Sequence, residues 1–170
     1  SVFASLLDAQ RGGHFALTPV TEVRTRKQMY LPDSAILVTR YLSEAGIAEV
    51  LDFMPIDRPA VASDRRRIVR VVKGVRGRLE FEATVAPRFD YGRQGHDLEV
   101  HGTTAVFKGP NLGLRVTSLS PLERHGDDVR TRFEVGAGDV RGLMIESSTS
   151  DTWSELGHGR IIELYLETES

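Results

Sequence analysis

The sequence predicts an all-β fold: a two-sheet antiparallel β-sandwich with short terminal helices. Short segments rich in apolar and β-branched residues recur along the chain, and turn residues separate them. Several connections have the length of hairpin loops, which indicates antiparallel pairing. Some segments alternate apolar and polar residues, whereas others are apolar at both parities. Two kinds of strand are typical of two packed sheets.

The expected strands, in chain order, cover residues 14–18, 22–30, 36–42, 47–54, 67–75, 78–86, 97–101, 104–108, 112–118, 129–135 and 140–147. The turns at 43–46, 74–77, 101–103 and 126–128 are expected to join neighbouring strands as hairpins. In the segment 78–83, Leu79, Phe81 and Ala83 should point inward. Segments 36–38 and 68–72 should be central strands that are covered on both faces. The expected core includes Phe53, Phe81, Val71, Val106, Leu114 and Phe133.

Helical patterns are expected at both ends of the chain. Residues 1–8 place three apolar side chains on one helical face before a Gly-Gly stop at residues 12 and 13. Residues 157–170 place Ile161, Ile162, Tyr165 and Leu166 on an apolar stripe. We expect this stripe to dock on another copy of the chain or to be mobile. The domain boundary is therefore placed at residue 156, and the chain is expected to be an excised piece of a longer protein.

Composition excludes several classes of protein. The 22 basic and 24 acidic residues are mixed and give a net charge of −2, which argues against nucleic-acid and anionic-membrane partners. The chain has no cysteine, so disulfides and thiolate metal sites are excluded. No apolar run approaches the roughly 20 residues that span a bilayer. The N-terminus lacks the pattern of a signal peptide, although Ser1 need not be the natural start. The expected location is cytoplasmic.

Catalytic and metal-binding patterns are weak. Glycoside hydrolysis needs two carboxyl groups that face one bond, and the neighbouring carboxylates here are interpreted as solvated surface groups: Glu80 with Glu82, Asp127 with Asp128, and Glu167 with Glu169. The five histidines have no metal-ligand spacing. His96, Asp97 and His101 are interpreted as part of an ordinary exposed hairpin, with a metal site as the alternative. No metal and no cofactor is expected. The basic residues between positions 65 and 78 are interpreted as the charged edge of a strand.

The run at 87–93 is the main candidate site, because Arg88, Asp90, Tyr91 and Arg93 gather in a turn that leaves a strong strand. One interpretation is structural: Asp90 caps the turn or pairs with Arg88 or Arg93, while a buried Phe89 anchors it. The other is a binding surface on a rigidly supported loop.

A second turn and the aromatic residues complete the candidates. Tyr30 and Asp33 lie in the second turn, and with the run at 87–93 they form the candidate interdomain or sugar-proximal residues. Trp153 and Tyr91 are interpreted as packing residues, with a sugar-stacking platform as the alternative.

Several motifs together resemble one family. In order, they are the segment 1–8, Gly12-Gly13-His14-Phe15, Tyr30-Leu31-Pro32-Asp33, Asp52-Phe53-Met54-Pro55, Gly74-Val75-Arg76-Gly77 and the run at 87–93. They resemble the N-terminal β-sandwich domain of bacterial trehalase-like and glucoamylase-like enzymes of glycoside hydrolase family 15. One departure is Ser34-Ala35 where the family often has Thr-Asn.

The resemblance implies a non-catalytic domain that packs on a separate catalytic (α/α) barrel and helps to shape its active site. It implies that residues 157–170 begin a linker helix toward that barrel, which is absent from this chain. The parent would be an inverting glycoside hydrolase of the α-glucosidase or trehalase type, acting on a carbohydrate substrate. A homo-oligomer through the exposed apolar ends is a further expectation. The alternative is an independent carbohydrate-binding module.

Overall fold

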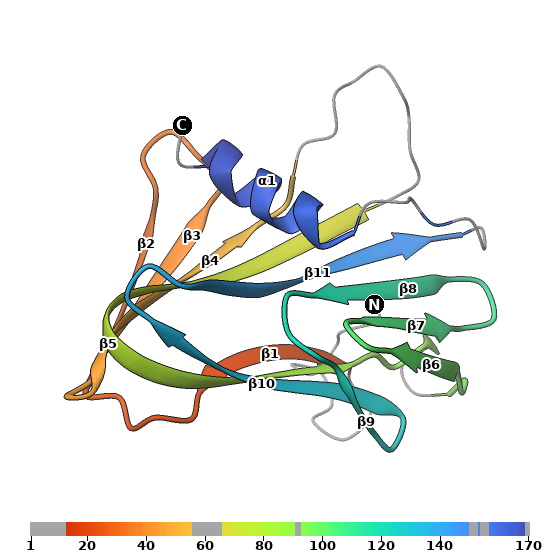
Figure 1. The fold of residues 1–170 in the computed structure, drawn as a ribbon. Helices are drawn as coiled ribbons and strands as arrows, with labels where there is room; N and C mark the ends of the chain where they lie inside the picture. The colour runs from red at the N-terminus through yellow and green to blue at the C-terminus, as the bar shows by residue number, and fades with distance from the viewer. Residues whose placement is uncertain (1–12, 56–65, 91–92, 150–152, 154–156, 169–170) are drawn as a thin grey trace.

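The computed structural model describes residues 13–55, 66–90, 93–149, 153 and 157–168. The expected helix at 1–8, the residue Tyr91 and the loop at 56–65 lie outside the described residues. The described elements, in chain order, are β1 (His14–Pro19), β2 (Thr25–Tyr30), β3 (Leu37–Leu42), β4 (Gly46–Phe53), β5 (Arg66–Ala86), β6 (Asp97–His101), β7 (Thr104–Lys108), β8 (Gly113–Ser118), β9 (Glu123–His125), β10 (Asp128–Gly136), β11 (Val140–Ser148) and α1 (His158–Thr168). The predicted all-β sandwich is confirmed (Figure 1).

Two antiparallel sheets face each other and share strand β5 (Figure 1). The large sheet has the strand order β2-β3-β4-β5-β11-β8-β7-β6. The small sheet has the order β1-β5-β10-β9. We call the face of the large sheet that is turned toward the small sheet its inner face, and the opposite face its outer face.

Strand β5 passes from one sheet to the other without a hairpin. Its first part pairs with β4 and β11, and its last part, from Arg78, pairs with β1 and β10. The predicted hairpin at 74–77 is therefore wrong. Two glycines permit the bend instead: Gly77 has φ of 61°, and a Cβ on Gly74 would lie 1.8 Å from the carbonyl oxygen of Gly136.

The other three predicted turns are confirmed as hairpins. Residues 43–46 join β3 to β4, 101–103 join β6 to β7, and 126–128 join β9 to β10. Strand β9 itself was not predicted, because its three residues are polar and exposed and carry no periodic signal.

The inner core lies between the two sheets. At its centre, the fully buried Phe81 packs edge-on against Tyr41 at 5.8 Å and stacks with Phe133 at 6.2 Å. Leu79, Phe81 and Ala83 all point into this core as predicted. Of the expected core residues, Phe81, Leu114 and Phe133 are confirmed. Phe53 and Val71 belong to a different cluster, and Val106 is only half-buried.

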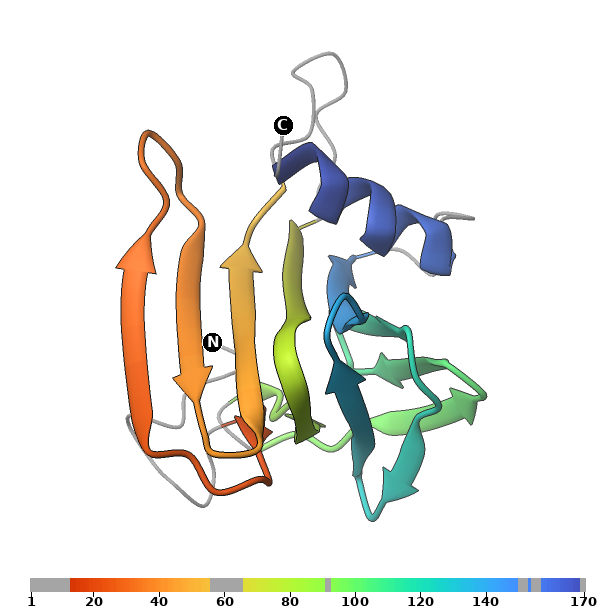
Figure 2. The same cartoon turned by 60° about the vertical axis from the view of Figure 1, so that its left-hand side comes forward.

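A second apolar cluster covers the outer face of the large sheet. Helix α1 lies across this face (Figures 1 and 2) and buries Ile161, Leu164 and Tyr165 against the sheet. The sheet side of the cluster consists of Val38, Leu51, Phe53, Val69, Val71 and Met144. Central strands that are apolar at both parities need cover on both faces, and α1 supplies the second cover.

The predicted helical stripe needs a correction. We expected it to dock on another copy or to be mobile, but the sheet of the same chain buries two of its four residues, Ile161 and Tyr165. The contact uses Leu164, whereas Leu166 is 56% exposed. In the described part of the chain, no helix has the length and apolar character that crossing a bilayer would need.

The basic segment on β5 is not an edge. Strand β5 lies in the middle of both sheets, and four of its cations have partners within the domain. Three ion pairs join it to neighbouring strands: Arg67 with Glu146, Arg70 with Asp52, and Arg78 with Glu134. Lys73 lies 5.9 Å from the ring centroid of Tyr165 on α1.

Arg70 ties the two sheets together at one side of the sandwich. From the inner face of the large sheet its guanidinium donates to the backbone carbonyl of Phe15 on β1, and it lies 4.4 Å from the ring centroid of Phe15. Its Nε is 2.7 Å from Oδ1 of Asp52, in an ion pair whose geometry falls short of a hydrogen bond. Burial raises the pKa of Asp52, and the charges of Arg70 and Arg26 oppose that rise.

This pKa shift predicts a pH dependence of stability. Because the folded-state pKa of Asp52 lies above the unfolded value of 3.8, its contribution to the free energy of unfolding should fall as pH rises from 3.8 through the folded pKa. Asp52→Asn removes the titrating carboxyl group and therefore this pH-dependent part of the free energy of unfolding. Urea midpoints of both proteins between about pH 3 and pH 7 should show wild type losing stability relative to the variant as pH rises. If the stability of wild type relative to the variant stays constant or increases as pH rises, the pKa of Asp52 is not raised.

Candidate functional site

The structure places the predicted site residues in two separate regions. Tyr30 ends β2, at one edge of the large sheet, and Asp33 lies in the β2–β3 turn. Arg88, Asp90 and Arg93 follow the end of β5. Phe89 in that second region contacts His96, which precedes β6 at the opposite edge of the sheet. The two regions do not form one site.

Aromatic packing holds the loop after β5 in place. Phe89 is buried and packs edge-on against His96 at 5.5 Å, and His96 packs on Phe107 at 5.3 Å. The backbone nitrogen of Arg93 donates to the carbonyl oxygen of Asp90 at 3.0 Å. Asp90 itself is exposed and has φ of 48°. The predicted anchoring by Phe89 is confirmed.

Arg88 has its partner inside the domain. Its guanidinium binds both carboxylate oxygens of Asp128 on β10, at 2.6 and 3.1 Å, and also donates to the carbonyl of Pro87 at 2.8 Å. The hydrogen bond to Asp128 raises the pKa of Arg88. The interpretation that Arg88 pairs with Asp90 is therefore wrong, since its partner lies 40 residues further along the chain. Arg88 fixes the loop to the small sheet.

Arg88→Ala is expected to destabilise the domain by about 1.5 kcal/mol, because a bidentate bond to a charged partner is lost. That value lies at the lower end of the usual range, since solvent reaches part of the pair. Urea unfolding of the 170-residue chain measures it. Arg93→Ala, at an exposed side chain of the same loop, is the matched control and should leave the midpoint unchanged. Equal midpoints for both variants would show that the pair has no structural role.

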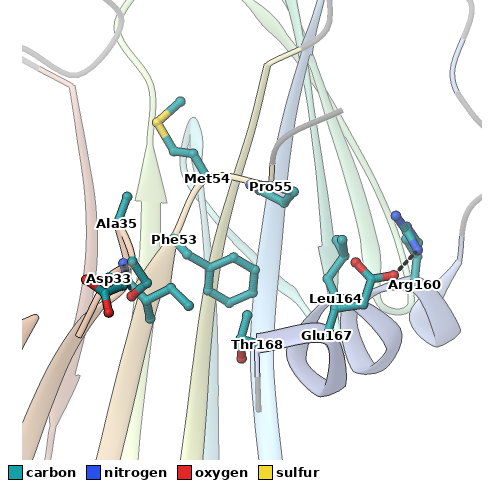
Figure 3. A pocket seen from close by; sticks show the side chains of 11 residues that line it. Asp33, Ala35, Phe53, Met54, Pro55, Arg160, Leu164, Glu167 and Thr168 are labelled. Carbon is teal, nitrogen blue, oxygen red and sulfur yellow. Dashed lines mark hydrogen bonds and ion pairs between the residues drawn. The ribbon is translucent and has the colours of Figure 1, made fainter. Parts of the chain in front are cut away.

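A groove of about 380 Å³ lies between the β2–β3 turn, the end of β4 and the C-terminal half of α1 (Figure 3). Its apolar lining comprises Ala35, Ile36, Phe53, Met54, Pro55 and Leu164. Its polar lining comprises Asp33, Ser34, Arg160, Glu167 and Thr168. Ala35 stands where the resemblance expects an Asn, so the groove is more apolar at that point than the motif implies.

Local hydrogen bonds fix both walls of the groove. In the β2–β3 turn, the Ser34 hydroxyl donates to the carbonyl of Leu31 at 3.0 Å and accepts from the backbone nitrogen of Ile36 at 3.3 Å. Asp33 occupies the left-handed region with φ of 55°, as Asp tolerates in turns. On α1, Arg160 pairs with Glu163 at 3.1 Å and with Glu167 at 3.3 Å.

Large apolar side chains lie exposed at this end of the large sheet. Met54 lines the groove and is 60% exposed, while Tyr30 and Met29 at the end of β2 are 68% and 47% exposed. Exposed apolar groups that gather in one region mark surfaces for protein or ligand contacts. This groove and its rim are therefore the candidate functional site.

The least exposed carboxylate of the described residues lies elsewhere and has a structural role. The Glu146 side chain is 1% exposed and bridges Arg67 at 2.9 Å and Arg115 at 2.7 Å. The guanidinium of Arg115 lies 5.6 Å from the ring of Trp153. That indole also packs over Gly113, where a Cβ would come within 3.0 Å of it. Among the described residues no cluster of metal-ligating side chains is present.

Sequence reasoning found one residue of the groove, Asp33, and missed most of the others. The motif Asp52-Phe53-Met54-Pro55 was a usable signal, because the exposed Met54 and the half-buried Pro55 follow a buried strand there. The residues of α1 that line the groove could not be identified from the sequence, because tertiary packing decides which face of the helix contacts the sheet.

The family described as "Trehalase-like, N-terminal" matches residues 1–118. Trehalase 2 of Sulfolobus acidocaldarius is 31% identical over 110 residues, which cover 65% of this chain and 17% of that protein. The trehalase of Mycobacterium tuberculosis is 26% identical over 161 residues, which cover 82% of this chain and 24% of that protein. The chain thus spans about a fifth of the length of the curated relatives that it matches.

One solved structure, a putative kojibiose phosphorylase from the human microbiome, superposes on 91% of this chain and 24% of its own, with a TM-score of 0.47 and 7% identity.

Proposed function

The chain belongs to the trehalase-like N-terminal domain family, and from this premise we propose that it is the non-catalytic N-terminal domain of a glycoside hydrolase of family 15. In this proposal the domain packs on a separate catalytic barrel, helps to shape its active site, and continues into it through α1 and the residues that follow. The observation that carries the proposal is the family match, together with the small share of each trehalase that the chain covers.

The contacts of the buried and half-buried carboxylates support the assignment of catalysis to another part of the parent protein. Glycoside hydrolysis needs one carboxyl group as an acid and a second, facing it, as a base or nucleophile. In this domain Glu146, Asp52 and Asp128 are each paired with arginine side chains of the same domain, so each of them already has a structural partner. The acid and base are therefore assigned to the rest of the parent protein.

The substrate of the parent is proposed to be trehalose or another α-glucoside, hydrolysed with inversion. Proton NMR of the glucose first released from trehalose by the full-length parent tests this. Inversion gives one β-anomer for each α-anomer, because the attacked ring inverts while the leaving glucose keeps its α configuration. Early release of the α-anomer alone would contradict inversion, and no glucose release from any α-glucoside would contradict the hydrolase assignment.

The exposed ring of Tyr30 at the end of β2 favours one second candidate, an independent carbohydrate-binding module, since sugar rings stack on exposed aromatic side chains. Calorimetric titration of the 170-residue chain with trehalose and maltooligosaccharides separates the two functions. The leading proposal expects no saturable binding. Saturable binding that Tyr30→Ala abolishes would favour the module.

A further inference from the structure

We propose that the groove between the β2–β3 turn and α1 is covered in the parent protein by the polypeptide segment that immediately follows residue 170. The occupant places an apolar side chain on the exposed part of the apolar lining, at Ala35, Ile36 and Met54. This inference rests on the proposed function, because it requires a parent that continues beyond this chain. Beyond that function, it names the two parts that come into contact: the groove and the segment that covers it.

The position of the helix end is the first argument. Thr168, the last residue of α1, itself lines the groove (Figure 3). An extended residue spans about 3.3 to 3.6 Å, so a chain that turns back after α1 reaches the groove within a few residues. The relatives continue far beyond the matched region, since the match covers only 17% and 24% of two trehalases.

The distribution of exposed apolar side chains is the second argument. Tyr30 and Met54 are the two most exposed large apolar side chains among the described residues, and both lie at this end of the large sheet. Val20 and Val75, at 42% and 44% exposure, lie near the bend of β5 at the other end of the sandwich. The uncovered apolar surface is thus greatest where the helix ends.

The size and charge of the groove limit the occupant. A volume of about 380 Å³ lies at the lower end of the range for pockets that hold a small ligand and suits a few side chains. A tethered segment is present at millimolar effective concentration, so even a weak apolar contact is populated. Asp33 lines the groove beside the Arg160–Glu167 ion pair. The charged lining therefore carries one net negative charge, which favours a segment with Lys or Arg beside its apolar residue.

The other candidate surface is less suited to this role. In the loop after β5, Phe89 is buried in the core of its own domain and Arg88 is bound to Asp128. Phe89 and Arg88 thus already have contacts within the domain, whereas the side chains of Met54 and Tyr30 remain exposed.

Thiol labelling tests the proposal, because the chain has no cysteine of its own. Met54→Cys reports on the groove, and Val75→Cys, at the bend of β5, is the matched control. Each is placed in three proteins: the 170-residue chain, the chain extended by about 20 natural residues, and the full-length parent, with any cysteine of the added sequence replaced by Ser. The extension of about 20 residues exceeds the few that the geometry requires.

The proposal predicts that Met54→Cys reacts about tenfold more slowly in both longer proteins than in the 170-residue chain, which corresponds to about 1.4 kcal/mol. Val75→Cys should react equally in all three. Equal rates at Met54→Cys in all three proteins would overturn the proposal. If Met54→Cys reacts more slowly only in the full-length parent, the next domain covers the groove and the proposal is wrong. If its labelling in the 170-residue chain slows as protein concentration rises, a second copy covers the groove and the proposal is also wrong. Glycosidase activity of the same parent sample tests the proposed function independently of these labelling rates.

Discussion

Glu146→Gln is expected to lower the free energy of unfolding by about 3 to 5 kcal/mol, because it removes the carboxylate charge of a buried network. The Glu146 side chain is 1% exposed, and those of Arg67 and Arg115 are 10% and 11% exposed. Breaking a buried pair in this way leaves charge in a place that water reaches poorly. Glutamine has nearly the same shape, so the effect reports charge rather than packing.

Urea unfolding of the 170-residue chain, followed by circular dichroism, measures this loss. Glu134→Gln is the control, because it breaks the Arg78–Glu134 pair, in which both side chains are mostly exposed. The control should leave the urea midpoint almost unchanged. If the two variants unfold at the same urea concentration, the buried network does not stabilise the fold.

Gly74→Ala should cost about 3 kcal/mol, since the added Cβ would lie 1.8 Å from the backbone carbonyl oxygen of Gly136. The backbones are bonded to each other there: Gly74 donates to Asp139 at 2.9 Å and accepts from Gly138 at 2.9 Å. The turn between β10 and β11 therefore cannot move away without losing these bonds. The substitution should loosen the bend at which β5 changes sheets.

Thermal unfolding measures the cost at Gly74. Gly95→Ala is the matched control, because a Cβ at Gly95 meets no atom within 4 Å, and it should be neutral or slightly stabilising. A Gly74→Ala variant as stable as the control would mean that the close approach to Gly136 does not shape the bend.

Strand burial could be predicted well from the sequence. Alternation placed Leu79, Phe81 and Ala83 in the core. The apolar run at 68–72 predicted cover on both faces, and the structure buries Val69 and Val71 under α1 and Val72 between the sheets. These assignments depend only on the period of two along a strand.

The path of β5 could not be predicted in this way. The sequence Gly74-Val75-Arg76-Gly77 suits a hairpin as well as a bend, because glycine permits both. The approach of Gly136, 62 positions away along the chain, and the pairing of β10 with β5 decide between them. Contacts between residues so far apart in the chain cannot be predicted from a short sequence pattern.

In the candidate site, too, local features could be predicted from the sequence and non-local contacts could not. Local turn chemistry identified Asp33 and the loop with Phe89. The partner of Arg88 is Asp128 on β10, and no local rule distinguishes that carboxylate from Asp90. The groove combines three segments, so it exists only after α1 has docked on the large sheet.

The most direct test of the central claim is complementation of the parent enzyme. Glucose release from trehalose is measured for the parent lacking residues equivalent to 1–170, for the 170-residue chain, and for the two mixed. The account predicts no turnover by the chain alone, weak turnover by the truncated parent, and recovery when the chain is added. Turnover by the chain alone, or full activity of the truncated parent without it, would contradict the claim that this domain supports a catalytic site that it does not contain.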